Sequence, residues 1–145
     1  MAQPTQNLAN HARYVPMFHI VGAGLIAIWL YSSIARLFHE PSHHHAIELC
    51  PPLALAIVYW YARAFALAVQ DRVIRLEMRL RLERLLAPEQ FARFDQLEVG
   101  QLVALRFAGD AELPGLVAEV LEGKLALPAD IKKRIRHWQA DWLRA

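Results

Sequence analysis

The first 62 residues of this 145-residue chain carry almost no charge. They hold two arginines and two glutamates, whereas residues 63–145 hold the other 14 basic and 12 acidic residues. The chain also has a single cysteine, Cys50, which excludes an intrachain disulfide. Apolar residues make up 56% of the sequence, which excludes a disordered chain. The chain therefore divides into an apolar first half and a charged second half.

The first uncharged run predicts a transmembrane helix over residues 14–38. No Asp, Glu, Lys or Arg occurs in the 22 residues from Tyr14 to Ala35. About 20 apolar residues cross the hydrocarbon core of a bilayer as a helix. A secretory signal peptide is the rival interpretation, but the run is too long and no small-residue cleavage site precedes the polar segment that follows.

A second apolar run predicts a second transmembrane helix over residues 47–69. The polar, histidine-rich residues 39–46 separate the two runs, and Pro41 within them cannot continue a helix. Because so short a connection joins antiparallel neighbours, we expect a two-helix transmembrane hairpin. Residues 1–13 are expected to form a flexible N-terminus.

The distribution of arginine predicts the orientation of these spans. Five arginines follow the second run between residues 72 and 84, whereas the connection between the runs offers only Arg36 and histidines. Basic residues near span ends favour the cytoplasmic side. We therefore expect a multi-pass protein of a bacterial inner membrane, with both termini in the cytoplasm, residues 39–46 in the periplasm and membrane lipids around the spans.

The second span is predicted to continue into the cytoplasm through residues 70–87. No Gly or Pro occurs from Leu53 to Ala87, so one helix of about 35–40 residues is expected, since these two residues are the usual helix breakers. Two apolar stripes run along this extension. They are interpreted as adjacent, which makes a face wide enough to need neighbours on two sides. The stripes are Val69, Val73, Leu76 and Leu80, and Ile74, Met78, Leu82 and Leu85.

Residues 88–145 predict a cytoplasmic helical domain. Pro88 and Pro128 are placed to begin helices, and Gly123 is placed to end one. No segment shows sustained alternation of apolar and polar residues, so the fold class is all-α. The last helix is expected to run from Pro128 to the end of the chain.

Four histidines form the first candidate site: His39, His43, His44 and His45. Imidazole suits Zn or Cu, and copies from several subunits could together supply a ligand set. Sensing of pH is a second interpretation, and a solvated loop tip is the third. No other cofactor is expected.

Arg63 and His19 form the second candidate site, because both are predicted near the cytoplasmic ends of the spans. A charged residue inside a span is costly and often functional, so the pair could line an aqueous pore. In the alternative interpretation the Arg63 side chain extends toward the lipid headgroups.

The predicted last helix is the third candidate site, with Trp138 and Trp142 on one face and basic residues beside them. It could lie on the anionic inner leaflet or dock onto the helical domain. Nucleic acid is not expected as a partner, because the neighbouring residues 88–130 have a net charge of −5 and repel phosphate. The basic residues are Lys132, Lys133 and Arg136.

Catalytic motifs are missing from the sequence. It has no nucleophile elbow, no HExxH motif and no P-loop, so no catalytic residue and no enzymatic activity are expected. The leading expectation is a non-enzymatic, self-assembling membrane protein that acts as a scaffold or binds a cytoplasmic protein partner. The alternative is a homo-oligomeric ion channel with Arg63 near the pore and a histidine-rich outer loop.

Three stretches in the second half carry a resemblance: EQFARFDQL at residues 89–97, GQLVALRFAGDAELPGLV at residues 100–117 and DIKKRIRHWQADWLRA at residues 130–145. With the two apolar runs upstream, the chain resembles a family of small bacterial membrane proteins classed only as a domain of unknown function. The resemblance covers most of the chain, residues 13–145. It implies two spans and a C-terminal cytoplasmic region, and no activity, cofactor or catalytic residue.

Overall fold

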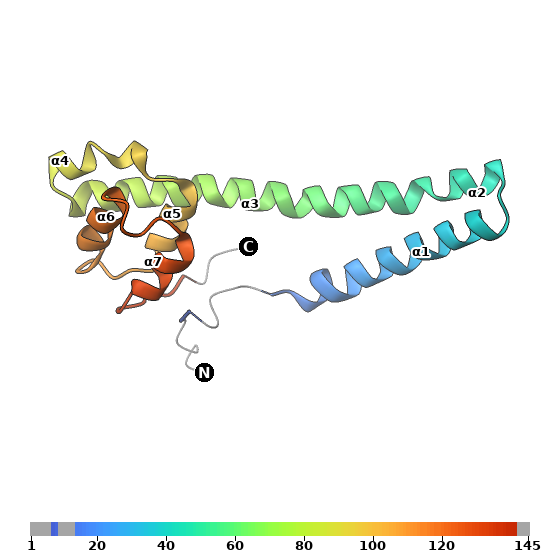
Figure 1. Ribbon diagram of the computed structural model, residues 1–145, viewed down its shortest axis with the longest axis horizontal. Coiled ribbons are helices and arrows are strands. Elements are labelled where there is room, and N and C mark those ends of the chain that lie inside the picture. Colours follow the sequence, from blue (N-terminus) through green and yellow to red (C-terminus); the bar gives the residue numbers. More distant parts are fainter. Residues whose placement is uncertain (1–6, 9–13, 142–145) are drawn as a thin grey trace. The chain divides into compact units, whose positions relative to one another are not determined.

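The structure, a computed structural model, describes residues 7–8 and 14–141 (Figure 1). The predicted flexible N-terminus, residues 1–13, lies outside this part of the chain except for residues 7–8. The described residues form helices and turns, and they contain no strand beyond one isolated bridge. The all-α prediction is therefore confirmed for the described residues.

The chain divides into two compact units. The first unit is Arg13–Ala66, and the second is Leu67–Ala145 together with Met1–Ala12. The boundary falls inside a helix, α3, which covers Cys50–Leu85 and contributes to both units. Its 36 residues confirm the single long helix expected from the lack of Gly and Pro.

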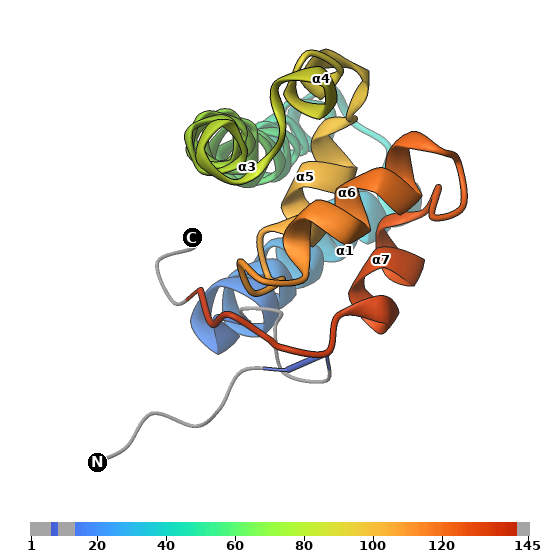
Figure 2. The same cartoon turned by 90° about the vertical axis from the view of Figure 1, so that its left-hand side faces the viewer.

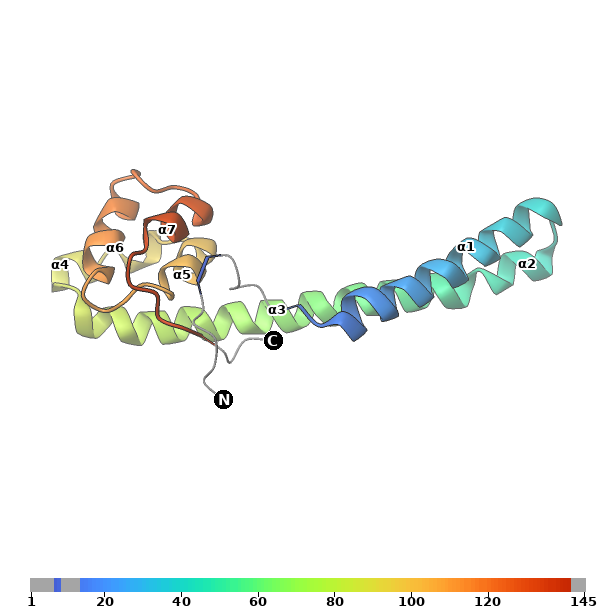
Figure 3. The same cartoon turned by 90° about the horizontal axis from the view of Figure 1, so that it is seen from below.

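The first unit consists of a π-helical segment, Met17–Gly22, that leads into α1, Ala23–His39, followed by α2, His43–Glu48, and the start of α3. Figures 1 and 3 both show α1 beside α2 and the start of α3. Two helical stretches, Met17–His39 and His43–Leu85, are long and apolar enough to cross a membrane.

The predicted loop over residues 39–46 is wrong for its second half, because α2 begins at His43. Only Glu40–Ser42 is non-helical. The Ser42 hydroxyl accepts a hydrogen bond from the His45 backbone N–H at 3.1 Å. This N-cap satisfies one of the free donors of the first helical turn, so the histidines form a helix rather than an open loop.

An aromatic contact joins α3 to the π-helical segment in the first unit. The rings of Phe18 and Tyr59 stack with centroids 4.2 Å apart, and the Tyr59 hydroxyl donates a hydrogen bond to the Phe18 carbonyl. Gly22 lies so close that a Cβ there would be 3.1 Å from the Tyr59 ring, whereas Gly24 has nothing within 4 Å. The small residue at position 22 therefore permits the close approach.

The second unit adds short helices to the last part of α3. They are α4, Pro88–Phe91; a 3₁₀ turn, Phe94–Gln96; α5, Val99–Leu105; α6, Leu113–Leu121; and α7, Pro128–Arg134. Gly123 ends α6 with φ +77°. Its N–H bonds to the Val120 carbonyl, and the Lys124 N–H bonds to the Glu119 carbonyl. This is a Schellman motif, as the glycine predicts.

One of the two apolar stripes of α3 faces the core of this unit. Ile74, Met78 and Leu82 are buried against residues of α5, α6 and α7. Viewed down α3, helices α4 to α7 lie on one side of it (Figure 2). The expectation of two adjacent stripes is wrong, because at 3.6 residues per turn their centres lie about 165° apart, on nearly opposite sides of the helix. The Val69–Leu80 stripe is exposed.

The C-terminal helix is shorter than expected and ends at Arg134. Ile135 is extended, with φ −64° and ψ 126°, and Trp138 forms an antiparallel bridge with Ala108. Gly109 N–H donates to the His137 carbonyl at 2.9 Å, and Gln139 N–H donates to the Phe107 carbonyl at 2.8 Å. These bonds satisfy the backbone of the segment after α7, which competes with continued helix.

Candidate functional site

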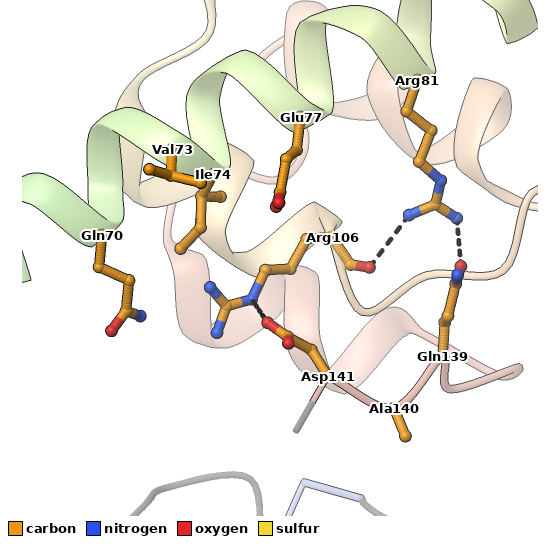
Figure 4. Close-up of a pocket in the computed structure, with 9 residues that line it drawn as sticks. All are labelled: Gln70, Val73, Ile74, Glu77, Arg81, Arg106, Gln139, Ala140 and Asp141. Atoms are coloured by element: carbon orange, nitrogen blue, oxygen red, sulfur yellow. Dashed lines mark hydrogen bonds and ion pairs between the residues drawn. The ribbon is translucent and has the colours of Figure 1, made fainter. Parts of the chain in front are cut away.

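A hollow of about 300 Å³ lies on the second unit (Figure 4). Its polar lining comes from three segments: Gln70, Glu77 and Arg81 of α3, Arg106 after α5, and Gln139 and Asp141 near the C-terminus. Figure 4 shows Glu77 pointing into the space between the two arginines. Because the hollow brings together charged side chains from distant parts of the sequence, it is a candidate binding site.

Arg81 connects α3 to two segments distant in sequence. Its guanidinium donates to Asp110 Oδ1 at 2.7 Å, to the Arg106 carbonyl at 3.0 Å, to the Ala108 carbonyl at 2.6 Å and to Gln139 Oε1 at 2.7 Å. A guanidinium has at most five N–H donors. Four bonds to its own chain therefore leave Arg81 little capacity for a ligand.

Arg106 is the one arginine buried among the described residues. Its Nε lies 3.3 Å from Asp141 Oδ2, and its guanidinium carbon lies 4.6 Å from the Phe107 ring centroid. A buried charge is tolerated when it is paired, and an arginine also gains from an aromatic face. The pair fastens the C-terminal segment to the end of α5.

The chemistry of this hollow favours a structural junction over a catalytic or anion-binding site. Both arginines bind groups of their own chain. The lining contains no serine, threonine, cysteine or histidine, and its two carboxylates are those of Glu77 and Asp141. The sequence analysis missed these residues, because their partners lie 25 to 58 positions away and no local sequence pattern indicates such contacts.

A smaller hollow of about 190 Å³ includes Glu112, Glu119 and Arg134. The Glu112 carboxylate accepts hydrogen bonds from the backbone N–H groups of Arg136 and His137, at 3.1 and 3.0 Å. Arg134 donates to both oxygens of Glu119 at 3.2 Å. Those hydrogen bonds hold the pKa of the Glu119 carboxyl below its usual value and raise the pKa of Arg134. Both glutamates thus bind the segment that contains and follows α7.

The four candidate histidines are not brought together. His45 Nδ1 lies 2.7 Å from the Glu40 carbonyl, and His44 Nε2 lies 3.4 Å from Glu48 Oε1, one helical turn further on. Throughout the described ranges, no group of three or more His, Cys, Asp or Glu side chains is placed to hold a metal ion. A single chain therefore supplies no ligand set for Zn or Cu at His39, His43, His44 and His45.

His19 and Arg63 are also not joined by the structure. The His19 ring stacks on Tyr14 with centroids 4.8 Å apart, and its Nδ1 lies 2.9 Å from the Val15 carbonyl. Arg63 is half-buried on α3. His19 thus serves the local structure at the start of the π-helical segment.

The candidate residues at the C-terminus are divided between the core and the surface. Trp138 packs on Phe107 with ring centroids 5.0 Å apart, and the Lys132 ammonium lies 5.9 Å from the same ring. Lys133 pairs with Asp130 at 3.3 Å. Trp138 is therefore docked on the second unit, through an extended segment rather than the expected helix. Arg136 is exposed, and Trp142 lies outside the described residues.

Comparison with known proteins agrees with the resemblance found in the sequence. No curated protein and no solved structure matches the chain. A family model described as "Family of unknown function (DUF6526)" matches residues 1–145, the full length of the chain. The chain therefore belongs to the DUF6526 family, whose function is unknown.

Proposed function

We propose that this protein is a two-span, self-assembling protein of a bacterial inner membrane that acts as a scaffold without enzymatic activity. The first unit is a transmembrane hairpin. The second unit is a cytoplasmic helical domain that α3 holds at the membrane surface, where it binds a protein partner. Both termini lie in the cytoplasm.

The observation that carries this proposal is the uncovered apolar surface of the two long helices. In the most apolar stretch of each, only 6% of the residues are buried, and large side chains such as Ile28, Val58, Trp60 and Phe65 are exposed. Soluble proteins rarely leave so much contiguous apolar surface in water. Lipid covers it without further protein, because a helix satisfies its own backbone hydrogen bonds.

Two further observations support the arrangement. The second unit has its own hydrophobic core, so it needs no lipid to fold. The arginines that follow the second apolar run, including Arg72, Arg75 and Arg79, lie on this side of the span, which favours the cytoplasm.

Cysteine accessibility tests the topology. The chain has one cysteine, so Cys50→Ser provides a background for Glu40→Cys, in the turn after α1, and Ala92→Cys, on the exposed surface of the second unit. In spheroplasts, a membrane-impermeant maleimide is expected to label the first variant and to reach the second only after lysis. Release of the protein by alkaline carbonate, or the reverse labelling pattern, would contradict the proposal.

Native mass spectrometry in nanodiscs tests self-assembly. The expected mass is a multiple of the 16.5 kDa chain, independent of dilution over the working range. A single chain at all concentrations would contradict the self-assembling scaffold while leaving the membrane topology intact.

A further inference from the structure

An apolar stripe on the second unit has no cover in the described structure. Val69, Val73, Leu76 and Leu80 lie on α3 and are 61, 49, 59 and 54% exposed. They lie roughly opposite the side chains with which α3 packs onto its own unit, since residues advance by about 100° along a helix. Helices α4 to α7 gather on that other side (Figure 2). The helices that the structure describes in this unit therefore leave the stripe uncovered, and Val73 alone of the four residues also borders the larger hollow.

The spacing within the stripe identifies the kind of surface that fits it. The intervals are four, three and four residues, which is the alternation of d and a positions in a coiled coil. Val73 then occupies an a position and Leu76 the following d position. This central pair, a β-branched residue at a and leucine at d, is the combination that favours two parallel strands, whereas the outer positions hold Val69 at d and Leu80 at a.

We propose that this stripe binds the same stripe of a second copy, so that two α3 helices form a short parallel coiled coil from Val69 to Leu80. The inference rests on the proposed membrane topology, because copies inserted in one direction present α3 in parallel. A seam of 12 residues is short for a free coiled coil. Anchoring both chains in one membrane raises their effective concentration and offsets this shortness.

The charges that flank the stripe agree with a parallel copy. In this register Arg72 occupies a g position and Glu77 the e position that it meets on the other helix. The pairing occurs twice by symmetry, and both side chains are exposed. Glu77 points into the larger hollow in the single chain (Figure 4), so it changes rotamer to make this pair. Arg79 would face Arg84 of the second copy. Its guanidinium carbon instead lies 5.8 Å from the Phe94 ring centroid of its own chain, which directs that charge away from the seam.

Disulfide crosslinking in native membranes tests the proposed contact. In the Cys50→Ser background, Val73→Cys and Leu76→Cys place thiols on the stripe. Arg75→Cys is the matched control, because it is exposed on the same helix and directed away from the stripe. Mild oxidation is expected to give several-fold more product of twice the chain mass at positions 73 and 76 than at position 75, since a disulfide requires Cα atoms within about 7 Å.

A second variant separates this contact from folding. Leu76→Glu is expected to abolish the two-copy species in nanodiscs while the helical content and unfolding midpoint stay unchanged, because the side chain lies outside the unit's own core. Equal crosslinking at all three positions, or a product that contains a different protein, would overturn the inference. If the protein is an oligomer in the membrane but positions 73 and 76 do not crosslink, the seam is wrong and the proposed function stands. If carbonate releases the protein, the proposed function itself fails.

Discussion

The two units of this protein hold their helices together by different means. In the second unit, apolar side chains from α3 and the helices after it form one buried core, and Leu82, Leu102 and Phe107 are completely enclosed. In the first unit the large apolar side chains face outward, and a stacked pair, Phe18 and Tyr59, provides the aromatic contact between α3 and the π-helical segment. The second unit is stabilised by its own interior, whereas the described residues of the first unit leave most of their large apolar side chains exposed.

The largest expected effect on stability comes from removing one enclosed side chain of the second unit. Leu82→Ala is expected to lower the free energy of unfolding of the second unit by about 2–5 kcal/mol, because it leaves a cavity in a closed core. Leu127→Ala, at an exposed leucine of the same unit, is the matched control and should change it by less than about 0.5 kcal/mol. Urea denaturation of the detergent-solubilised protein, followed by tryptophan fluorescence, measures both. Equal effects would mean that the core is not the source of stability.

Loss of the Arg81 hydrogen bonds tests whether the C-terminal segment unfolds together with the rest of the second unit. Arg81→Ala leaves the carbonyls of Arg106 and Ala108 without their donor and should cost about 2–3 kcal/mol, as expected for hydrogen bonds to a charged group. Arg81→Lys should not restore this stability, because one ammonium cannot reproduce a planar fork of donors. The control is Arg84→Ala, on the exposed part of α3. Recovery with lysine would contradict the junction.

Local signals were enough to predict the long helices and the end of α6. The run without charge marks the first long apolar helix, the lack of Gly and Pro marks α3, and Gly123 marks the end of α6. The histidine-rich turn was predicted too long for a related reason. Ser42 can cap a helix or continue a loop, and its residue type alone does not distinguish the two.

The parts that could not be predicted depend on partners far away in the chain. The spacing of Ile131, Ile135 and Trp138 fits an amphipathic helix, yet pairing with residues 107–109 selects an extended segment after Arg134. Which apolar stripe of α3 is buried is likewise decided by α5 to α7 and not by α3. Two of the four acceptors of Arg81 are backbone carbonyls 25 and 27 residues away, and every residue has such a carbonyl, so the sequence does not single these out.

Substitutions at two neighbouring glycines test the close helix packing in the first unit. Gly22→Leu should weaken the contact between the π-helical segment and α3 by about 1–2 kcal/mol, because the added side chain meets the Tyr59 ring. Gly24→Leu is the matched control, since nothing lies within 4 Å of a Cβ there. Titration of the solubilised protein with SDS, followed by near-ultraviolet circular dichroism, compares the two. If the Gly24 variant were equally destabilised, general disturbance of the helix would explain both results.

The smallest expected effect concerns the ion pair between α6 and α7. Hydrogen bonds from Arg134 lower the pKa of the Glu119 carboxyl in the folded state, so folding favours its ionised form. The resulting stability is present above the usual pKa of a glutamate and is lost as the pH falls through the lowered value. Glu119→Gln should therefore be less stable than the natural chain at neutral pH and equally stable in acid.

The effect is small because exposed ion pairs contribute little, and Glu89→Gln on α4 controls for the loss of one charge. Denaturation midpoints of the three chains at neutral and acidic pH measure it. A difference that is the same at both would show that the carboxylate's charge is not what joins α7 to α6.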